Sequence, residues 1–169
     1  MNIRNCVASL LIITSATVLN ACAQAPQEQI VSRVSAAESP VSTTGLPLAL
    51  VHKSPSCGCC GLWVKHLEDS GFQVEVRNSD DVNLVKQHLG VPYGKGSCHT
   101  AEIGGYFIEG HVPAEDIKRL LAEKPNAKGL VLPGMPMGSP GMESPDGTSQ
   151  PYVVELVQRD GTTSPFSQH

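Results

Sequence analysis

The thiol motif Cys57-Gly58-Cys59-Cys60 stands between a short apolar run and an amphipathic stretch, and this placement constrains the fold more than any other feature. Residues 48–52 (LALVH) form the apolar run, which is bounded by prolines and predicts a buried strand. Residues 62–67 have the apolar spacing of a helix, and Gly71 is placed to end it. The folded part of the chain therefore begins with a strand, a thiol cluster and a helix.

The rest of the chain continues this alternation. The pattern predicts strands at residues 72–77, 106–108 and 152–158, a helix from Ser79 or Asp80 to Gly90, and a helix that starts near Pro113 and ends before Pro125. Such alternation predicts an α/β layer architecture, and a thiol motif at the first strand-to-helix junction is the thioredoxin arrangement. We expect one small thioredoxin-like domain over residues 46–169, with helices flanking a mixed sheet.

The N-terminus indicates export. Residues 1–5 carry one cation, and residues 6–19 are apolar and uncharged but too short for a membrane anchor, which predicts a signal peptide over residues 1–22. Residues 19–22 (LNAC) resemble a lipobox, in which Cys22 would carry a lipid anchor, although Asn20 is unusual there. Ordinary signal-peptidase cleavage is the alternative. In both cases we expect a periplasmic product.

The segment after the signal peptide and the overall charge limit the partners. Residues 23–45 are rich in Ser, Thr, Ala, Pro and Gln, which predicts a flexible tether. The net charge is −4, and an acidic chain lacks the basic stripe that nucleic-acid binding requires. Any membrane contact would come through the lipid anchor.

The thiol motif predicts a metal site. Exported proteins usually oxidise their cysteines, so a structural disulfide is the alternative interpretation. A third thiol in the same turn does nothing for such a bridge, and adjacent Cys59 and Cys60 can pair only through a strained ring. A helix N-terminus also favours thiolates, which are the metal-binding form of cysteine.

A second thiol region lies about forty residues further on. Cys98 and His99 precede the strand predicted at residues 106–108, and in a thioredoxin-like fold the loop before that strand abuts the active-site motif. We therefore expect Cys98 to approach the first three thiols, as a fourth ligand or, in the oxidised protein, as a disulfide partner. His99 is a candidate ligand, or else only a hydrogen-bond partner.

Residues 134–142 (GMPMGSPGM) hold every methionine except the initiator. Methionine usually fills gaps in a core, but a loop this rich in Gly and Pro is a poor core element. Thioethers bind Cu(I) well and zinc poorly. Met137 and Met135 are the first candidate ligands, with Met142 as a third.

The remaining histidines and Trp63 are weaker candidates. His52 ends the first predicted strand, from where its side chain could face the thiol motif. His111 lies in the turn at the start of the last predicted helix. His66 and His88 lie among charged residues, so we expect them on the solvated surface. Trp63 is expected in the core.

Four motifs together resemble the CopG-type family of periplasmic copper-resistance proteins. They are residues 54–61 (SPSCGCCG), residues 97–101 (SCHTA), Gly105-Tyr106 followed by residues 108–114 (IEGHVPA), and residues 133–143 (PGMPMGSPGME). Their extent covers residues 48–157. The resemblance implies a thioredoxin-like fold, a cysteine-bridged copper cluster and interconversion of Cu(I) and Cu(II) in support of copper efflux. It says nothing about lipid anchoring.

These observations predict that Cys57, Cys59, Cys60 and Cys98 bind more than one copper ion, with His99 and one or two methionines completing the shell. If the protein catalyses repeated oxidation or reduction of copper, it is a copper oxidoreductase. If it only binds and releases copper, it is a copper buffer or chaperone. Expected partners are copper ions, with efflux components or periplasmic copper chaperones. The alternatives are a thiol–disulfide oxidoreductase that uses Cys57 and Cys60, and a structural zinc module, which usually needs two separated C-x-x-C knuckles.

Overall fold

The computed structural model describes residues 45–169. The predicted signal peptide, the lipid anchor at Cys22 and nearly all of the predicted tether lie outside the described residues. Within them, no helix has the length and apolar character needed to cross a membrane. The elements are β1 (Ala49–Lys53), α1 (Gly58–Asp69), β2 (Val74–Asn78), α2 (Val82–Leu89), β3 (His99–Ile103), β4 (Tyr106–Glu109), α3 (Ala114–Glu123), β5 (Ala127–Val131), β6 (Val153–Gln158) and β7 (Thr163–Gln168).

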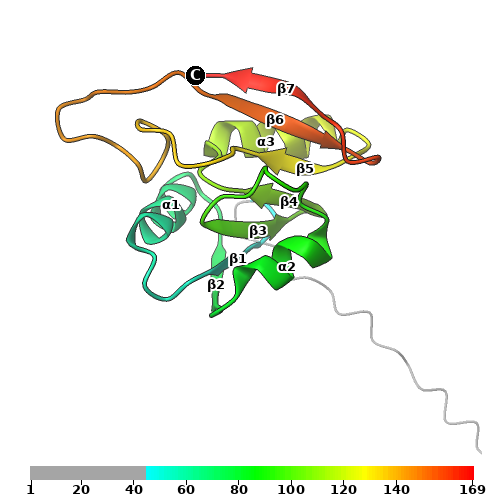
Figure 1. The fold of residues 1–169 in the computed structure, drawn as a ribbon, viewed down its shortest axis with the longest axis horizontal. Helices are drawn as coiled ribbons and strands as arrows, with labels where there is room; N and C mark the ends of the chain where they lie inside the picture. The colour runs from blue at the N-terminus through cyan, green and yellow to red at the C-terminus, as the bar shows by residue number, and fades with distance from the viewer. Residues whose placement is uncertain (1–44) are drawn as a thin grey trace, which may run out of the picture. The chain divides into compact units, whose positions relative to one another are not determined.

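The strands form a seven-stranded mixed sheet in the order β2-β1-β3-β4-β5-β6-β7, as Figure 1 shows. β1 pairs in parallel with β2, and β4 pairs in parallel with β5, whereas the other neighbours are antiparallel. This small α/β domain, with the thiol motif between β1 and α1, fits a thioredoxin-like fold. The sequence-based prediction of the fold class is confirmed.

Helices cover both faces of the sheet. The main core packs α1 and α3, through residues such as Trp63, Leu67 and Ile117, against inward side chains of the strands. On the opposite face Phe107, Val131 and Val157 form a smaller cluster, and Leu89 from α2 packs against it. Because side chains alternate along a strand, Phe107 and its neighbour Ile108 serve opposite faces.

The sequence pattern did not predict three of the strands, β3, β5 and β7. β3 (HTAEI) is only weakly apolar, and its pairing with β1 and β4 makes it a strand. β5 is interrupted by Gly129, where any Cβ would overlap the carbonyl oxygen of Phe107 on β4. β7 is a half-exposed edge strand that contains Pro165, a residue that edge strands tolerate.

The start of α2 also differs from its prediction. Asp81, rather than Ser79 or Asp80, is the N-cap, and its carboxylate accepts a hydrogen bond from the backbone N–H of Asn83 at 2.9 Å. Gly90 ends the helix in the left-handed conformation, as predicted.

Candidate metal centre

The first three cysteines occupy the N-terminal turn of α1. Cys57 is the N-cap and Cys59 and Cys60 lie in the first turn of the helix. A turn after β1, in which the N–H of Cys57 donates to the carbonyl of Ser54 at 3.1 Å, brings the chain from strand to helix. Cys60 is fully buried, whereas Cys57 and Cys59 are half-buried. The motif therefore presents its thiols at one end of α1, where the helix dipole favours negative charge.

Cys98 joins this group, as the sequence analysis predicts. One ligand atom from each of Cys57, Cys59, Cys60 and Cys98 lies within 4.8 Å of the others. Cys98 immediately precedes β3, the neighbour of β1, which explains how a residue distant in sequence reaches the thiol motif. The separation of the four sulfur atoms is compatible with one or more metal ions held between them.

The thiols are partly oxidised. Cys57 and Cys60 form a disulfide, whereas Cys59 and Cys98 are free. The Sγ atoms of Cys57 and Cys59 are 3.6 Å apart. The alternative in which Cys98 forms the disulfide is not the state observed. All four sulfur atoms become available as thiolate ligands only after a two-electron reduction of the Cys57–Cys60 bond.

Two buried imidazoles complete the surroundings of Cys98. The Sγ of Cys98 lies 3.3 Å from His99 Nδ1 and 3.1 Å from His111 Nε2. The three residues form a second group of ligand atoms within 4.8 Å of one another. Burial, with the neighbouring Cys59 thiol, raises the pKa of Cys98 to about 11. A metal ion that binds Cys98 at neutral pH must therefore displace its proton.

His99 and His111 are both neutral, which is the form of histidine that binds a metal ion. Burial lowers the pKa of His99 and of His111, so both rings are neutral at neutral pH. His111 Nδ1 donates to the carbonyl of Pro140 at 2.8 Å, which leaves Nε2 with a lone pair directed to Cys98. His99 packs on Trp63 with 4.3 Å between ring centroids, and its buried Nε2 has no hydrogen-bond partner in the described part of the chain.

His111 is more central than its sequence context indicates. β3 and β4 pair in antiparallel register with Thr100 opposite Glu109. Extending that register by two residues places Cys98 opposite His111. Recognition of residues 99–103 as a strand would have provided the signal, since the hairpin then brings the two residues together.

A buried ion pair holds the segment that carries Cys98. Glu109 Oε1 accepts hydrogen bonds at 2.5 Å from both Lys86 Nζ and the backbone N–H of Ser97. The carboxylate is fully buried, and burial raises its pKa although Lys86 acts in the opposite direction. Because Ser97 precedes Cys98, the pair fixes the backbone next to the thiol.

Two solved structures resemble this chain over most of its length. Both are of a copper resistance protein, copG, in forms 2 and 1. Form 2 is 47% identical, with a TM-score of 0.69, and the match covers 73% of this chain and 98% of that one. Form 1 is also 47% identical, with a TM-score of 0.68 and coverages of 72% and 96%. The chain belongs to the CopG family.

Two further comparisons add less. A family model described as a protein of unknown function, DUF411, matches residues 95–142, which include Cys98 and the methionine loop, residues 134–142. The search of curated proteins gives no match. The CopG relationship therefore rests on the solved structures and confirms the resemblance drawn from the four sequence motifs.

Two other histidines of this CopG-family protein, His52 and His66, make contacts that hold the fold together. His52 Nε2 lies 3.0 Å from Glu102 on β3, so the imidazole is engaged there rather than at the thiols. His66 Nε2 accepts from the backbone N–H of Ala114 at 3.0 Å, which ties α1 to the start of α3, and it is half-buried rather than fully solvated. His88 is exposed, as expected. Trp63 is buried, and its Nε1 donates to the carbonyl of Val112 at 2.9 Å.

The methionine loop lies against the helix that carries the thiol motif. Gly141 contacts α1 so closely that a Cβ there would lie 2.8 Å from the carbonyl oxygen of Cys59 and from the nitrogen of Trp63. Met135 and Met137 are 50% and 40% exposed. They line a pocket with Met142, and none of the four cysteines is among its described lining residues. The prediction that a methionine completes the cysteine shell stays a prediction.

Proposed function

We propose that this CopG-family protein, when reduced, binds more than one copper ion through Cys57, Cys59, Cys60 and Cys98. The observation that carries the proposal is the four sulfur ligands within 4.8 Å of one another. The similar solved structures are of a copper resistance protein, which favours copper over other soft metals. Thiolates are soft ligands and bind Cu(I) well.

The number of sulfurs supports a cluster with more than one ion. Three thiols within four residues crowd a single ion, because one helical turn cannot direct all of them to the corners of one tetrahedron. Bridging sulfur atoms relieve this crowding by serving two ions each. Cys98 adds a fourth sulfur within 4.8 Å of the other three.

Interconversion of Cu(I) and Cu(II) is the second part of the proposal. Sulfur ligands stabilise Cu(I), whereas imidazole also suits Cu(II). His111 Nε2 and His99 Nδ1 lie 3.1 and 3.3 Å from the Cys98 sulfur, so a copper ion on that sulfur has nitrogen donors within reach. A mixed shell of this kind lowers the cost of changing oxidation state, and that change would support copper efflux.

We also propose that the protein acts in the periplasm. The signal peptide predicted over residues 1–22 and the disulfide between Cys57 and Cys60 both fit an oxidising compartment. The protein would be attached to the membrane through Cys22 only if the signal peptide is removed by the lipoprotein route rather than by ordinary signal peptidase.

Metal analysis tests the copper assignment directly. Protein purified under anaerobic, reducing conditions is offered equal copper and zinc, and the bound metals are then measured. We expect copper to fill the site and to exclude zinc. Preferential retention of zinc would contradict the assignment.

The Cys57–Cys60 disulfide specifically favours one other function, that of a thiol–disulfide oxidoreductase. Such an enzyme would reduce insulin without any metal, by attack of one motif thiolate on the insulin disulfide. The copper proposal predicts that metal-free reduced protein does not accelerate insulin reduction. Metal-independent turnover would favour the oxidoreductase instead.

A further inference from the structure

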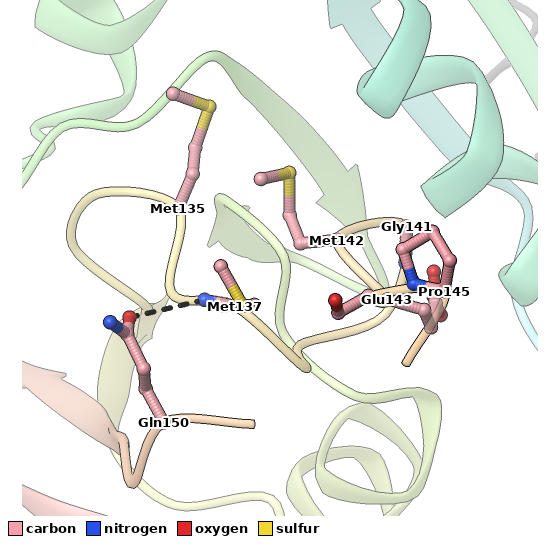
Figure 2. Close-up of a pocket in the computed structure, with 8 residues that line it drawn as sticks. Met135, Met137, Gly141, Met142, Glu143, Pro145 and Gln150 are labelled. Carbon is pink, nitrogen blue, oxygen red and sulfur yellow. Dashed lines mark hydrogen bonds between the residues drawn. The ribbon is translucent and has the colours of Figure 1, made fainter. Parts of the chain in front are cut away.

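A groove of about 1310 Å³ crosses the end of the sheet at which β1 begins. Residues 45–48, which lead into β1, and Gly104-Gly105, the turn between β3 and β4, line it. Leu89 from α2 and Leu121 from α3, which pack on opposite faces of the sheet, line it too. We call this surface the end groove. It shares no lining residue with the smaller pocket around the methionines of the loop, which Figure 2 shows.

The end groove and the thiol site lie at opposite ends of β1 and β3. In the antiparallel register of these strands, Ala49 pairs with Ile103 next to the groove, whereas Lys53 pairs with His99 next to the thiols. A strand of five residues is roughly 16 Å long. In Figure 1, α1 with the thiol motif lies at the left and the turn between β6 and β7 lies at the right. A partner in the end groove therefore leaves the thiols uncovered.

Positive charge dominates the lining of the end groove, although the chain has a net charge of −4. One lining residue, Glu102, is acidic, and it is engaged with His52 at 3.0 Å. The acids Glu123 and Asp160, which neighbour two of the cations in sequence, are not among the lining residues. The lining cations are Lys118, Lys124, Lys128 and Arg159.

These four cations differ from most others in the structure. None of them forms an ion pair within residues 45–169. Five other cations of the same residues are each paired with a carboxylate, namely Lys65, Arg77, Lys86, Lys95 and Arg119. The end groove is therefore a local basic surface whose charges are not neutralised by the described part of the protein.

The end groove also presents apolar surface. Six of its large apolar lining residues are only half-buried, namely Leu46, Leu48, Leu50, Leu89, Tyr106 and Leu121. Cations beside exposed leucines match the interface of an anionic bilayer, where phosphate groups lie above acyl chains.

The path of the chain favours a bilayer over a soluble acidic partner. The residues that precede the described part join it at Gly45, which lines the end groove. The tether predicted over residues 23–45 would have a mean length of about 25 Å, so a lipid on Cys22 would hold the groove near the membrane. A single lipid chain attaches a protein only marginally, and a basic surface is a common second signal.

We propose that the end groove docks this protein on an anionic lipid surface, with its four cations at the headgroup phosphates and its leucines against the acyl chains. The thiol site then faces away from the bilayer, towards the aqueous compartment. The inference rests on the proposed function only for the periplasmic setting. The docking itself requires neither copper nor the cysteines.

Vesicle binding tests the proposal. The chain is expressed as Cys22→Ser, which prevents lipid attachment, and is purified after removal of its signal peptide. It is then sedimented with vesicles of phosphatidylcholine alone or mixed equally with phosphatidylglycerol. We expect binding to the anionic vesicles only, and release at about 1 M salt, where charges are screened beyond about 3 Å. Equal binding to both vesicle types, or to neither, would overturn the proposal.

Two double variants identify the surface. Each cation near an anionic bilayer strengthens binding about fivefold, so Lys124→Gln with Arg159→Gln is expected to weaken binding about 25-fold. The control is Lys65→Gln with Arg77→Gln, which makes the same change in net charge at side chains that are 67% and 58% exposed outside the groove. Equal losses in the two variants would show that net charge alone drives binding, and the end groove would be wrong.

Tryptophan fluorescence tests the orientation. Leu48→Trp places an indole in the end groove, and Leu84→Trp places one on α2 outside it. The single native tryptophan, Trp63, is buried and gives a constant background. We expect anionic vesicles to shift the emission of Leu48→Trp to shorter wavelength and to leave Leu84→Trp unchanged. No shift in Leu48→Trp, or equal shifts in both, would contradict docking through this groove.

The remaining outcomes are distinct. If the protein ignores vesicles but binds soluble polyglutamate through the same cations, the groove takes an acidic polypeptide and the membrane proposal is wrong. Because the vesicle experiments contain no metal, their failure leaves the copper proposal standing. Failure of copper binding would equally leave a positive vesicle result intact.

Discussion

Cys98 Sγ and His111 Nε2 lie 3.1 Å apart, at the open end of the hairpin formed by β3 and β4. One residue precedes the hairpin and the other follows it, so the antiparallel register alone brings them together. His111 is oriented by the carbonyl of Pro140, which fixes the ring nitrogen that faces the thiol. The pair links the methionine loop to the proposed copper ligands.

Replacing Cys98 tests whether a distant residue belongs to the site. Cys98→Ser is expected to reduce bound copper and to change its absorption spectrum as severely as Cys59→Ser, because both remove one of four clustered sulfurs. Metal analysis and spectra of the two reduced variants provide the comparison. Unchanged stoichiometry in Cys98→Ser would show that three thiols suffice.

His111→Gln tests an imidazole that is only a weak candidate ligand from the sequence but lies 3.1 Å from the Cys98 sulfur. We expect copper affinity to fall about 10–100-fold, the cost of losing a ligand or a residue that orients one. The electron paramagnetic resonance spectrum of the copper(II) form is expected to lose nitrogen hyperfine coupling. His88→Gln, at an exposed position on α2, is the matched control and is expected to change neither property.

The sequence predicts the fold class and the placement of the first three thiols at the start of the first helix, because both depend on local patterns. The apolar run before Cys57 and the helical spacing after it define the first strand and helix. β3 and β7 are missed because sheet pairing, rather than their own apolar content, makes them strands. The role of His111 follows from the β3–β4 register, so it was missed together with β3.

Gly141→Ala tests the contact between the methionine loop and α1. Gly141 has φ +83°, and an added Cβ would lie 2.8 Å from backbone atoms of Cys59 and Trp63. Gly147 has a similar φ of +76° but open space around it, so Gly147→Ala carries the backbone strain alone, about 1 kcal/mol. Urea denaturation is expected to show a larger loss for Gly141→Ala, together with faster release of copper. Equal losses would mean that the loop does not press on α1.

Lys86→Met tests the ion pair behind Cys98. Removing Lys86 leaves the Glu109 carboxylate buried without its partner, and breaking such a pair costs about 3–5 kcal/mol. Denaturation of the metal-free protein measures the effect. Lys65→Met, which removes an exposed i,i+4 pair with Asp69, is expected to leave the midpoint almost unchanged. A stability loss no larger than in this control would contradict the role of the pair.

Titration of the reduced protein with Cu(I) against a competing chelator tests the central claim most directly. Four thiols that share bridging positions are expected to bind more than one ion per chain. The variant in which Met135, Met137 and Met142 are all leucine is titrated in parallel, so that copper bound by the thioethers does not contribute. We predict that this variant also binds more than one Cu(I) per chain. A sharp end point at one ion in that variant would contradict the cysteine cluster.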